Sequence, residues 1–299
     1  MTGRTERNNS IILVALSYSI WGIQAIYWHM FNNISSMHLL AWRIVWAAVF
    51  CFILLLAKGK LPAFTELVSD RRVLQFLILS SFAYVADYVL FTYSFVSGHV
   101  MDASIGGFLT PLLSFILSAA VFKERGNKLQ NIAIIVAAAG VAVLIIGYRK
   151  IPLLAVAIAV CATLFGFTKK LIHDVDSILS IAFDNIAVLP LFIVIGGICF
   201  RNEHAVISNW QYPLLIAGGL VTMLPLVIFA AGVKKINFRT LGFLQYLSPL
   251  LSLAAAFILN ENVDPLKIAS ISIIGVSVML FAIGNKKEHR VNVSVSHGI

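Results

Sequence analysis

Charged residues are scarce in this chain. Only 12% of its 299 residues are charged and 60% are hydrophobic, whereas ordinary soluble domains carry about 25% charged residues. So few charges could not cover the surface of a soluble protein, which excludes the soluble classes. Apolar runs of about 20 residues, long enough to cross about 30 Å of hydrocarbon, recur along the whole chain. Because these runs are continuous rather than alternating, they predict an all-α protein embedded in a lipid bilayer.

Cysteines and catalytic motifs are also scarce. The three cysteines, Cys51, Cys161 and Cys199, lie in separate apolar runs, which excludes a disulfide framework and a metal site. The chain has no HExxH, no Ser/His arrangement and no GxxxxGK[ST] loop, so we expect neither an enzyme nor an ATP-driven pump, and no cofactor. The net charge of +9 is explained by the loops between the spans, so we expect no nucleic acid as a partner.

The apolar runs predict ten membrane-spanning helices with both termini in the cytoplasm. In this orientation the inner segments carry 17 Lys and Arg residues, Lys169 and Lys170 among them, and the outer segments carry four. Such an excess is the positive-inside signal of membrane proteins. A cytoplasmic segment, 1–10, precedes the spans, and a cytoplasmic tail, 285–299, expected to be disordered, follows them. The spans are 11–31, 37–57, 73–96, 101–122, 129–148, 151–171, 178–200, 212–233, 238–259 and 266–283.

The second half of the sequence repeats the first. A shift of 138 residues aligns 88–114 with 226–252 without a gap and places LSPLLS on LTPLLS. We therefore expect two five-helix units, 11–148 and 151–284, and because five is odd the second must enter the membrane inverted. Inverted repeats are typical of secondary transporters, which bind their substrate near the midplane between the halves.

Each copy of the repeated motif places a proline inside a span. Pro111 and Pro249 are expected to kink their helices, and the preceding Thr110 and Ser248 are suited to bond backbone groups that a proline leaves free. The kinks either act as moving hinges or only shape helix packing, and the sequence leaves both interpretations open.

Several motifs resemble a known transporter family. The stretches LLAWRIVW at 39–46 and SGHVMDASIGGFLTPLLS at 97–114, and the P-L-L-S…E pattern of each half (111 to 124 and 249 to 261), are similar to the EamA-type transporters of the drug/metabolite transporter superfamily, in particular its RarD-type subgroup. The resemblance covers residues 11–284. The chain departs from the subgroup at Trp42, where a His is usual, and at Asp87, where an Asn is common.

The resemblance implies a multi-pass carrier of the bacterial cytoplasmic (inner) membrane that works without ATP. We expect a secondary active transporter that moves a small polar metabolite, an amino acid or related amine, by alternating access at a midplane site. Transport of quaternary ammonium compounds or other organic cations is the first alternative, and a non-transporting membrane scaffold is the second. We expect a monomer, with a dimer and proton coupling left open.

Four ionisable residues lie within or beside the spans, where charges are expensive and often functional. Arg43 and Asp87 are expected roughly 9 Å below the outer face, and Asp102 begins the fourth span, so the three could share one polar site. In the functional interpretation, Arg43 binds a carboxylate of the substrate, or Asp87 carries a proton or attracts a cationic group. In the alternative, Arg43 and Asp87 form a structural ion pair. Asp184 occupies the repeat position of Arg43 but is inverted, so we expect it near the inner face, away from Arg43.

Aromatic side chains cluster on particular helix faces. Trp21, Gln24 and Trp28 share one face of the first helix, since they are spaced at i, i+3 and i+7. An aromatic box beside a carboxylate suits an ammonium group through cation–π attraction, whereas the alternative is helix packing with interfacial belts. The residues expected to contact substrate are Trp21, Gln24, Trp28, Tyr84, Asp87, Tyr88, Phe91, Phe108, Phe165 and Tyr246.

Overall fold

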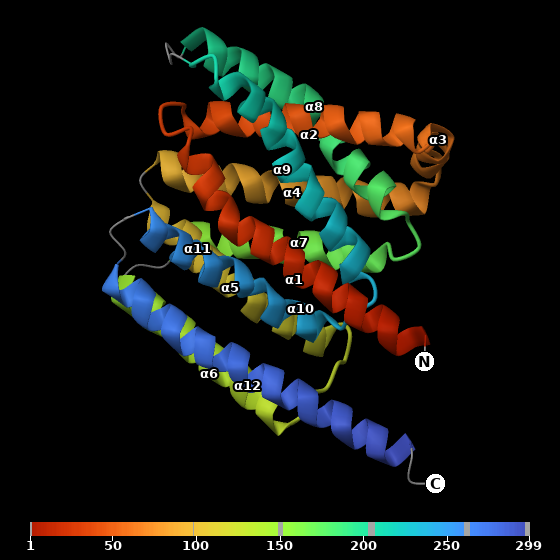
Figure 1. Ribbon diagram of the computed structural model, residues 1–299, viewed down its shortest axis with the longest axis vertical. Helices are drawn as coiled ribbons and strands as arrows, with labels where there is room; N and C mark the ends of the chain where they lie inside the picture. Colours follow the sequence, from red (N-terminus) through yellow and green to blue (C-terminus); the bar gives the residue numbers. More distant parts are fainter. Residues whose placement is uncertain (1, 98, 149–151, 203–206, 260–263, 297–299) are drawn as a thin grey trace.

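The computed structural model describes residues 2–97, 99–148, 152–202, 207–259 and 264–296, and every regular element in this part is a helix (Figure 1). Ten helical stretches are long and apolar enough to cross a membrane, which confirms the ten expected spans. The helices are α1 (Thr2–His29), α2 (Ser36–Ala57), α3 (Leu61–Ser69), α4 (Arg71–Val96), α5 (Val100–Ala120), α6 (Lys128–Tyr148), α7 (Leu153–Leu171), α8 (Ser177–Asn202), α9 (Gln211–Val233), α10 (Phe238–Gln245), α11 (Leu247–Ile258) and α12 (Pro265–Ser296).

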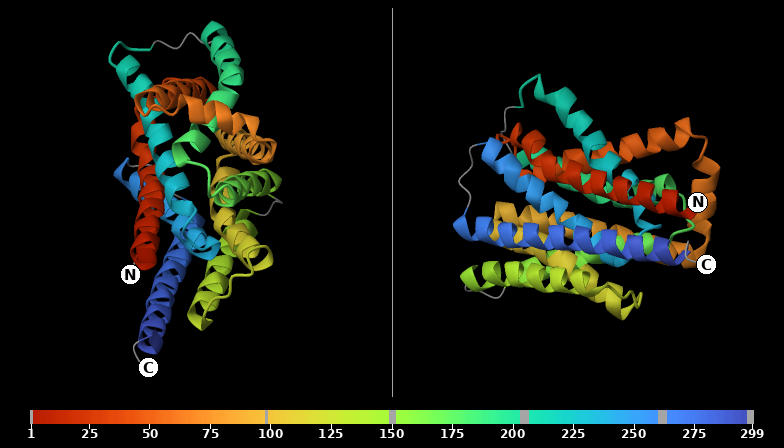
Figure 2. Two further views of the ribbon diagram at one scale, coloured as in Figure 1. Left: turned by 90° about the vertical axis from the view of Figure 1, so that its right-hand side faces the viewer. Right: turned by 60° about the horizontal axis from the view of Figure 1, so that its bottom comes forward.

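The bundle follows the repeat. Helix α1 begins and α12 ends at the same end of the molecule (Figures 1 and 2), whereas α7, the first helix of the second half, begins at the opposite end. Helix α1 packs against α9 and α11, and its counterpart α7 packs against α4 and α5. The counterparts α2 and α8 pack together, as do α6 and α12. The contacts that α1 of the first half makes with α9 and α11 are therefore equivalent to those that α7 of the second half makes with α4 and α5.

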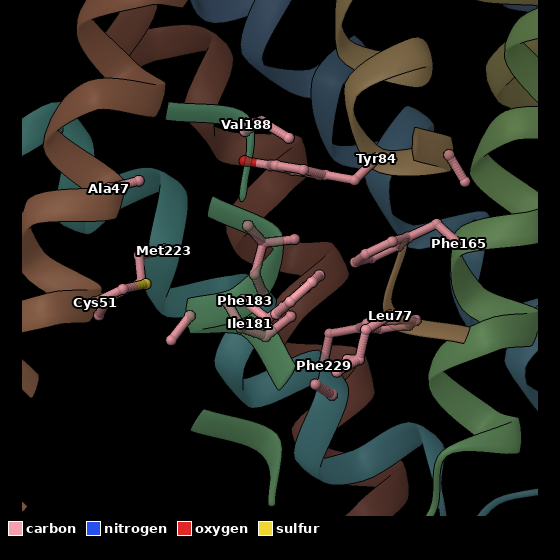
Figure 3. Packing of buried hydrophobic residues seen from close by; sticks show 14 of the residues in the cluster. Ala47, Cys51, Leu77, Tyr84, Phe165, Ile181, Phe183, Val188, Met223 and Phe229 are labelled. Carbon is pink, nitrogen blue, oxygen red and sulfur yellow. The ribbon is translucent and has the colours of Figure 1, made fainter. Parts of the chain in front are cut away.

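The main hydrophobic cluster lies where the two halves meet. Glycines allow the closest crossings between helices: a Cβ on Gly22 of α1 would lie 2.7 Å from the carbonyl oxygen of Ser248 on α11. Small residues at such crossings let helix backbones approach closely in a membrane. Figure 3 shows part of the cluster, with Ala47, Cys51, Leu77, Tyr84, Phe165, Ile181, Phe183, Val188, Met223 and Phe229 labelled.

One expected span is broken in the structure. The run 238–259 was expected to form a single kinked helix, but α10 ends at Gln245 and α11 begins at Leu247. Pro249 explains this correction, because its nitrogen cannot donate to the carbonyl of Gln245 and its ring crowds that carbonyl. Ser248, expected to bond the freed backbone, makes no side-chain hydrogen bond among the described residues.

Two further elements differ from expectation. The sequence pattern does not predict the short helix α3, which begins with Pro62 in its first turn and links α2 to α4. The tail was expected to be disordered, but α12 continues to Ser296. No proline or glycine interrupts residues 285–296, so nothing local ends the helix where it leaves the apolar span.

Candidate functional site

Arg43 of α2 points into the bundle and lies between aromatic rings. Its Cζ atom is 4.1 Å from the centre of the Trp28 ring on α1 and 5.3 Å from the Tyr88 ring on α4. Its Nε donates a hydrogen bond of 3.2 Å to Thr222 Oγ1 on α9. Cation–π attraction on two sides and one hydrogen bond therefore hold the guanidinium group where four helices meet.

This guanidinium group has no protein counter-ion in the described part of the chain. No carboxylate there lies within ion-pairing distance of Arg43, and Thr222 is its one hydrogen-bond partner among the same residues. The terminal nitrogens of an arginine form a planar fork that matches a carboxylate or phosphate. Since an uncompensated charge inside a membrane protein is costly, the geometry is that of a site for an anionic group.

Gln24 fixes the ring beneath Arg43. Its Nε2 donates to the Val221 carbonyl at 2.6 Å, and its Oε1 accepts from Trp28 Nε1 at 3.3 Å. Residues of α1 predicted to share a face are thus brought together. Trp21, one turn earlier, is half-buried, and its ring centre is 5.7 Å from that of Phe229.

Asp87 of α4 is half-buried and forms no hydrogen bond or ion pair with any described residue. It lies in electrostatic range of Tyr18 on α1, its neighbour Tyr88 and Cys161 on α7. The ion pair between Arg43 and Asp87, one of the two interpretations that the sequence left open, is therefore not formed. Similar depth did not bring them together, because Asp87 and Tyr88 point about 100° apart around α4 and Tyr88 is the residue that faces Arg43.

Asp102 does not join this site. It is 5% exposed on α5, and its Oδ2 accepts a hydrogen bond of 3.2 Å from Tyr148 of α6. The expected outer trio is corrected accordingly: α5 packs against α6, α7 and α10, whereas Arg43 lies among α1, α2, α4 and α9.

Tyr84 and Phe165 border the site from within the main cluster. Tyr84 Oη donates to Asn185 Oδ1 at 3.1 Å, and the centres of the Tyr84 and Tyr88 rings are 4.8 Å apart. Phe165 stacks on Phe229 at 5.9 Å. Both side chains are buried, and Tyr84 packs directly against Tyr88, the ring that faces Arg43.

Two expected contact residues lie elsewhere. Phe108 and Tyr246 are buried in a second cluster built around α5, α6 and α12, so we place neither beside Arg43 or Asp87. Phe91 is 43% exposed on α4, one turn beyond Asp87.

Lys169 was missed because it was counted as a loop charge. It lies inside α7 with a side chain that is 1% exposed, and its Nζ is 2.5 Å from Oδ2 of Asp184 on α8, which is equally buried. As expected, Asp184 does not pair with Arg43. A signal was available: an acid in an apolar span needs a counter-ion, and Lys169 lies just across the short α7–α8 connection.

Glu124 was also not among the expected site residues. Its carboxylate accepts the backbone amides of Phe238 at 2.9 Å and Arg239 at 2.8 Å, and the hydroxyl of Ser118 at 2.7 Å. It thus caps the start of α10 and joins the two halves. The matching Glu261 lies outside the described residues. A polar cleft at this end is lined by Arg7, Ile11, Glu124, Arg125, Gln130, Ile236, Asn237, Arg239, Thr240, Phe281 and Asn285.

Comparisons with known proteins agree with this architecture. The model of the EamA-like transporter family matches the chain twice, over residues 8–146 and 149–283. The chain is 29% identical to the uncharacterized transporter YojE of Bacillus subtilis, over 97% of this chain and 98% of that one. It is 26% identical to protein RarD of Escherichia coli, over 92% and 94%. A crystal structure that is 17% identical shares the fold with a TM-score of 0.73, over 93% of this chain and 98% of that one.

The chain belongs to the EamA-like transporter family. The resemblance to RarD-type proteins expected from the motifs is confirmed. Ten apolar helices and bacterial transporter relatives make it a multi-pass protein of the bacterial cell membrane. The family and the names of the relatives indicate a transporter rather than an enzyme.

Proposed function

We propose that the protein is a secondary active transporter for a small zwitterionic metabolite, an amino acid or closely related amine, and that both termini are cytoplasmic. The observation that carries the proposal is the Arg43 guanidinium group, held between Trp28 and Tyr88 without a counter-ion among the described residues. The substrate carboxylate would supply that counter-ion through two parallel hydrogen bonds. Asp87 forms no hydrogen bond or ion pair with any described residue, but it points about 100° away from Tyr88 around α4, so we do not assign it the ammonium group of the substrate in this conformation.

The packing supports movement by alternating access. At the end where α1 begins, α5 is tied to α10: Ser114 Oγ donates to Gln245 Oε1 at 2.9 Å, and a Cβ on Gly242 would lie 2.5 Å from the Phe115 ring. Towards the other end, α5 touches α11 only slightly. With cytoplasmic termini, this is a state closed to the cytoplasm. Exchange of the two halves' conformations would open that end and close the other.

Organic cations form the second candidate class, favoured by Asp87 near Tyr18 and Tyr88. Such a ligand leaves Arg43 without a counter-ion, so we rank it below the zwitterion. A thermal-shift screen should compare amino acids, the amines that lack their carboxylate, and quaternary ammonium compounds. A ligand at 100 times its Kd stabilises by about 2.7 kcal/mol.

We expect stabilisation by at least one amino acid, none by its amine, and loss of the effect in Arg43→Gln. Arg71→Gln, at the exposed start of α4, is the matched control and should keep the wild-type response. Stabilisation by amines alone, unaffected in Arg43→Gln, would favour the organic-cation class. If no solute stabilises the protein or is transported across the membrane of proteoliposomes, the non-transporting scaffold replaces the transporter as the proposed function.

The orientation has its own test. We expect a membrane-impermeant thiol reagent to label Ser97→Cys from outside and Lys235→Cys from inside, because these positions match in the two inverted halves. Both native side chains are accessible enough to report, since Lys235 is 56% exposed and Ser97 follows the end of α4. Labelling of both from the same side would contradict the inverted arrangement.

A further inference from the structure

The buried ion pair of the second half lies apart from the proposed substrate site. Lys169 of α7 and Asp184 of α8 are each 1% exposed, with Nζ and Oδ2 2.5 Å apart. Neither residue contacts Arg43, whose neighbours are Trp28, Tyr88 and Thr222. Substrate binding therefore does not explain the pair.

Stability does not explain the pair either. Taking two charges out of water is expensive, and replacing a buried ion pair by apolar residues is often neutral or stabilising. Ionisable residues inside a membrane protein most often mark ion pathways or proton relays. The pair has the position expected of such a group, because it joins α7 and α8 of the second half beside Ser81 on α4 of the first half.

Both partners have other hydrogen-bonding groups at hand if the pair separates. Lys169 Nζ also donates to Ser180 Oγ at 2.5 Å and to the Ser180 carbonyl at 3.3 Å, and it lies 5.4 Å from the Phe165 ring centre. Asp184 Oδ1 accepts from Ser81 Oγ at 3.1 Å. Loss of the charge on Asp184 would thus leave the lysine with two hydrogen-bond acceptors and an aromatic face.

The other titratable groups near the pair are few. Cys51 of α2 and Tyr84 of α4 lie in electrostatic range of Asp184, and Lys234, just after α9, lies in range of Lys169. Asp174 and Asp176, in the α7–α8 connection, lie in electrostatic range of Lys234. Lys234 also donates to the Val175 carbonyl in the α7–α8 connection, which places the pair close to the end of the bundle where α1 begins.

We propose that the Lys169–Asp184 pair is the site that binds a coupling proton. A hydronium ion from the cytoplasmic side gives its proton to an Asp184 carboxylate oxygen, so that an O–H bond forms and water leaves. Lys169 keeps its proton and charge, separates from Asp184 and retains its hydrogen bonds to Ser180. Release of the proton reverses both steps. Proton binding by this pair does not depend on the proposed transport function. Only the description of the proton as a coupling ion rests on it.

A chain of side-chain contacts joins this pair to the substrate site. Asn185, next to Asp184, accepts a hydrogen bond from Tyr84, and the Tyr84 ring packs against Tyr88. Tyr88 in turn faces Arg43. Movement of α8 on protonation would therefore shift the ring that helps hold the guanidinium group, which gives a physical route for coupling.

The first test detects the proton without any substrate. Infrared difference spectra of the full chain in lipid, recorded between neutral and acidic pH, should contain the carbonyl band of a buried protonated carboxylic acid. In an Asp87→Asn background, which removes the other intramembrane carboxylate that has no partner among the described residues, we expect Asp184→Asn to lose this band and Asp184→Glu to shift it, whereas Asp102→Asn, the matched buried control, should keep it. A band that remains unmoved in Asp184→Glu, or persists in a folded Asp184→Asn variant, would overturn the proposal.

The second test asks whether the proton moves the helices. With the three native cysteines replaced by alanine, Thr240→Cys on α10 reports opening of the polar cleft. Because the thiolate is the reacting form of a cysteine, the labelling rate at each pH is divided by that of Lys235→Cys, an exposed position. We expect acidic pH to change this ratio at least about fivefold, the lower end of typical coupling, and the neutral pair Lys169→Met, Asp184→Leu to remove this change. A pH response that survives in the folded double variant would refute the assignment.

Arg43→Gln separates this proposal from the substrate site. It should abolish stabilisation by amino acids but keep both the infrared band and the pH-dependent labelling. If no substrate is ever found but the band depends on Asp184, the proton site stands and the transport proposal fails alone. If amino acids stabilise the protein but Asp184 gives no band, the proton site fails alone.

Discussion

The two halves carry the same proline motif on counterpart helices, yet only one of these helices is broken. Helix α5 runs without interruption through Pro111, whereas Pro249 separates α10 from α11 at Tyr246. Along α5, Thr110 Oγ1 donates to the Gly106 carbonyl at 2.9 Å and the Thr110 carbonyl accepts from Thr163 of α7 at 3.3 Å. Around Pro249 no such side-chain support is present among the described residues, and Glu124 instead caps the start of α10.

This difference shows that a proline motif alone does not determine whether a helix breaks. The proline removes one backbone donor in both helices, but the surrounding packing decides whether the helix continues or separates into two. In inverted-repeat transporters the two halves adopt unlike conformations and exchange them. Under the proposed alternating access, the continuous α5 and the broken α10–α11 would be such a pair of conformations.

The halves differ at a second matched position. Arg43 in α2 faces aromatic rings and has no counter-ion in the described part of the chain, whereas Asp184, its counterpart in α8, is paired with Lys169. The membrane-crossing part of α1, the counterpart of α7, contains no lysine or arginine that could match Lys169. The charge of one copy of the repeat is thus held in an internal pair, and the charge of the other is the one that we propose binds the substrate.

The largest expected effect concerns this second difference. Lys169→Met alone leaves the Asp184 carboxylate buried and unpaired, so we expect a loss of about 3–5 kcal/mol in the free energy of unfolding. The double change Lys169→Met, Asp184→Leu should recover most of that loss. Unfolding in detergent with increasing denaturant measures both variants. Equal stability of the wild type and the single variant would show that the pair is not formed.

The prolines should respond unequally to replacement. Pro249→Ala restores a donor at the break, removing a helix-interior penalty of about 3 kcal/mol, and should join α10 to α11 and slow transport more than it changes protein level. Pro111→Ala, in a helix that is already continuous, should have the smaller effect on rate. Transport in proteoliposomes, normalised to the amount of protein, compares the two. Normal rates in both variants would mean that the prolines only shape packing.

Removing the cap of α10 should make the halves more alike. Glu124→Gln loses a charged acceptor of two backbone amides, and we expect unfolding to become easier by about 1.5–3 kcal/mol for the charge-assisted bonds. The cleft beside Thr240 should then label faster. Glu66→Gln on the exposed helix α3 is the control and should leave both values unchanged. Unchanged labelling in a folded Glu124→Gln variant would remove Glu124 from the closure of this end.

The smallest effect concerns the connection between α7 and α8. Partial burial raises the pKa of Asp176, but hydrogen bonds from Lys60, at 2.6 Å, and from two backbone amides outweigh it and hold this pKa below its ordinary value. A lowered folded-state pKa stabilises at neutral pH, and the contribution is lost as pH falls through that pKa. Wild type should therefore lose slightly more stability than Asp176→Asn between neutral pH and the acid range. An identical acid dependence in both would contradict this.

The sequence predicted the ten spans, but not the break in α10–α11, the short helix α3 or the helical tail. Continuous apolar runs predict spans because a helix in lipid must satisfy its own backbone. The proline motif is nearly the same in both halves, so it does not predict which helix breaks. The break depends on partners distant in sequence, such as Thr163 and Glu124. Loop charges likewise concealed Lys169, because counting basic residues does not show which side chain turns inward.

The candidate site was predicted in part. Helical spacing correctly grouped Gln24 with Trp28, because residues four apart lie on one helix face. Depth along the axis wrongly suggested an Arg43–Asp87 pair, because depth contains no information on rotation about the axis. The contact between Arg43 and Thr222 joins residues far apart in the chain, and no local pattern predicts it.

Solute counterflow in proteoliposomes tests the central claim most directly. Vesicles loaded with a mixture of unlabelled amino acids should accumulate a labelled amino acid when they contain the wild-type protein. They should not do so with a folded Arg43→Gln variant, whereas Arg71→Gln should behave as wild type. Accumulation by Arg43→Gln at the wild-type rate, or no counterflow of any amino acid by the wild type, would contradict a zwitterion site at Arg43.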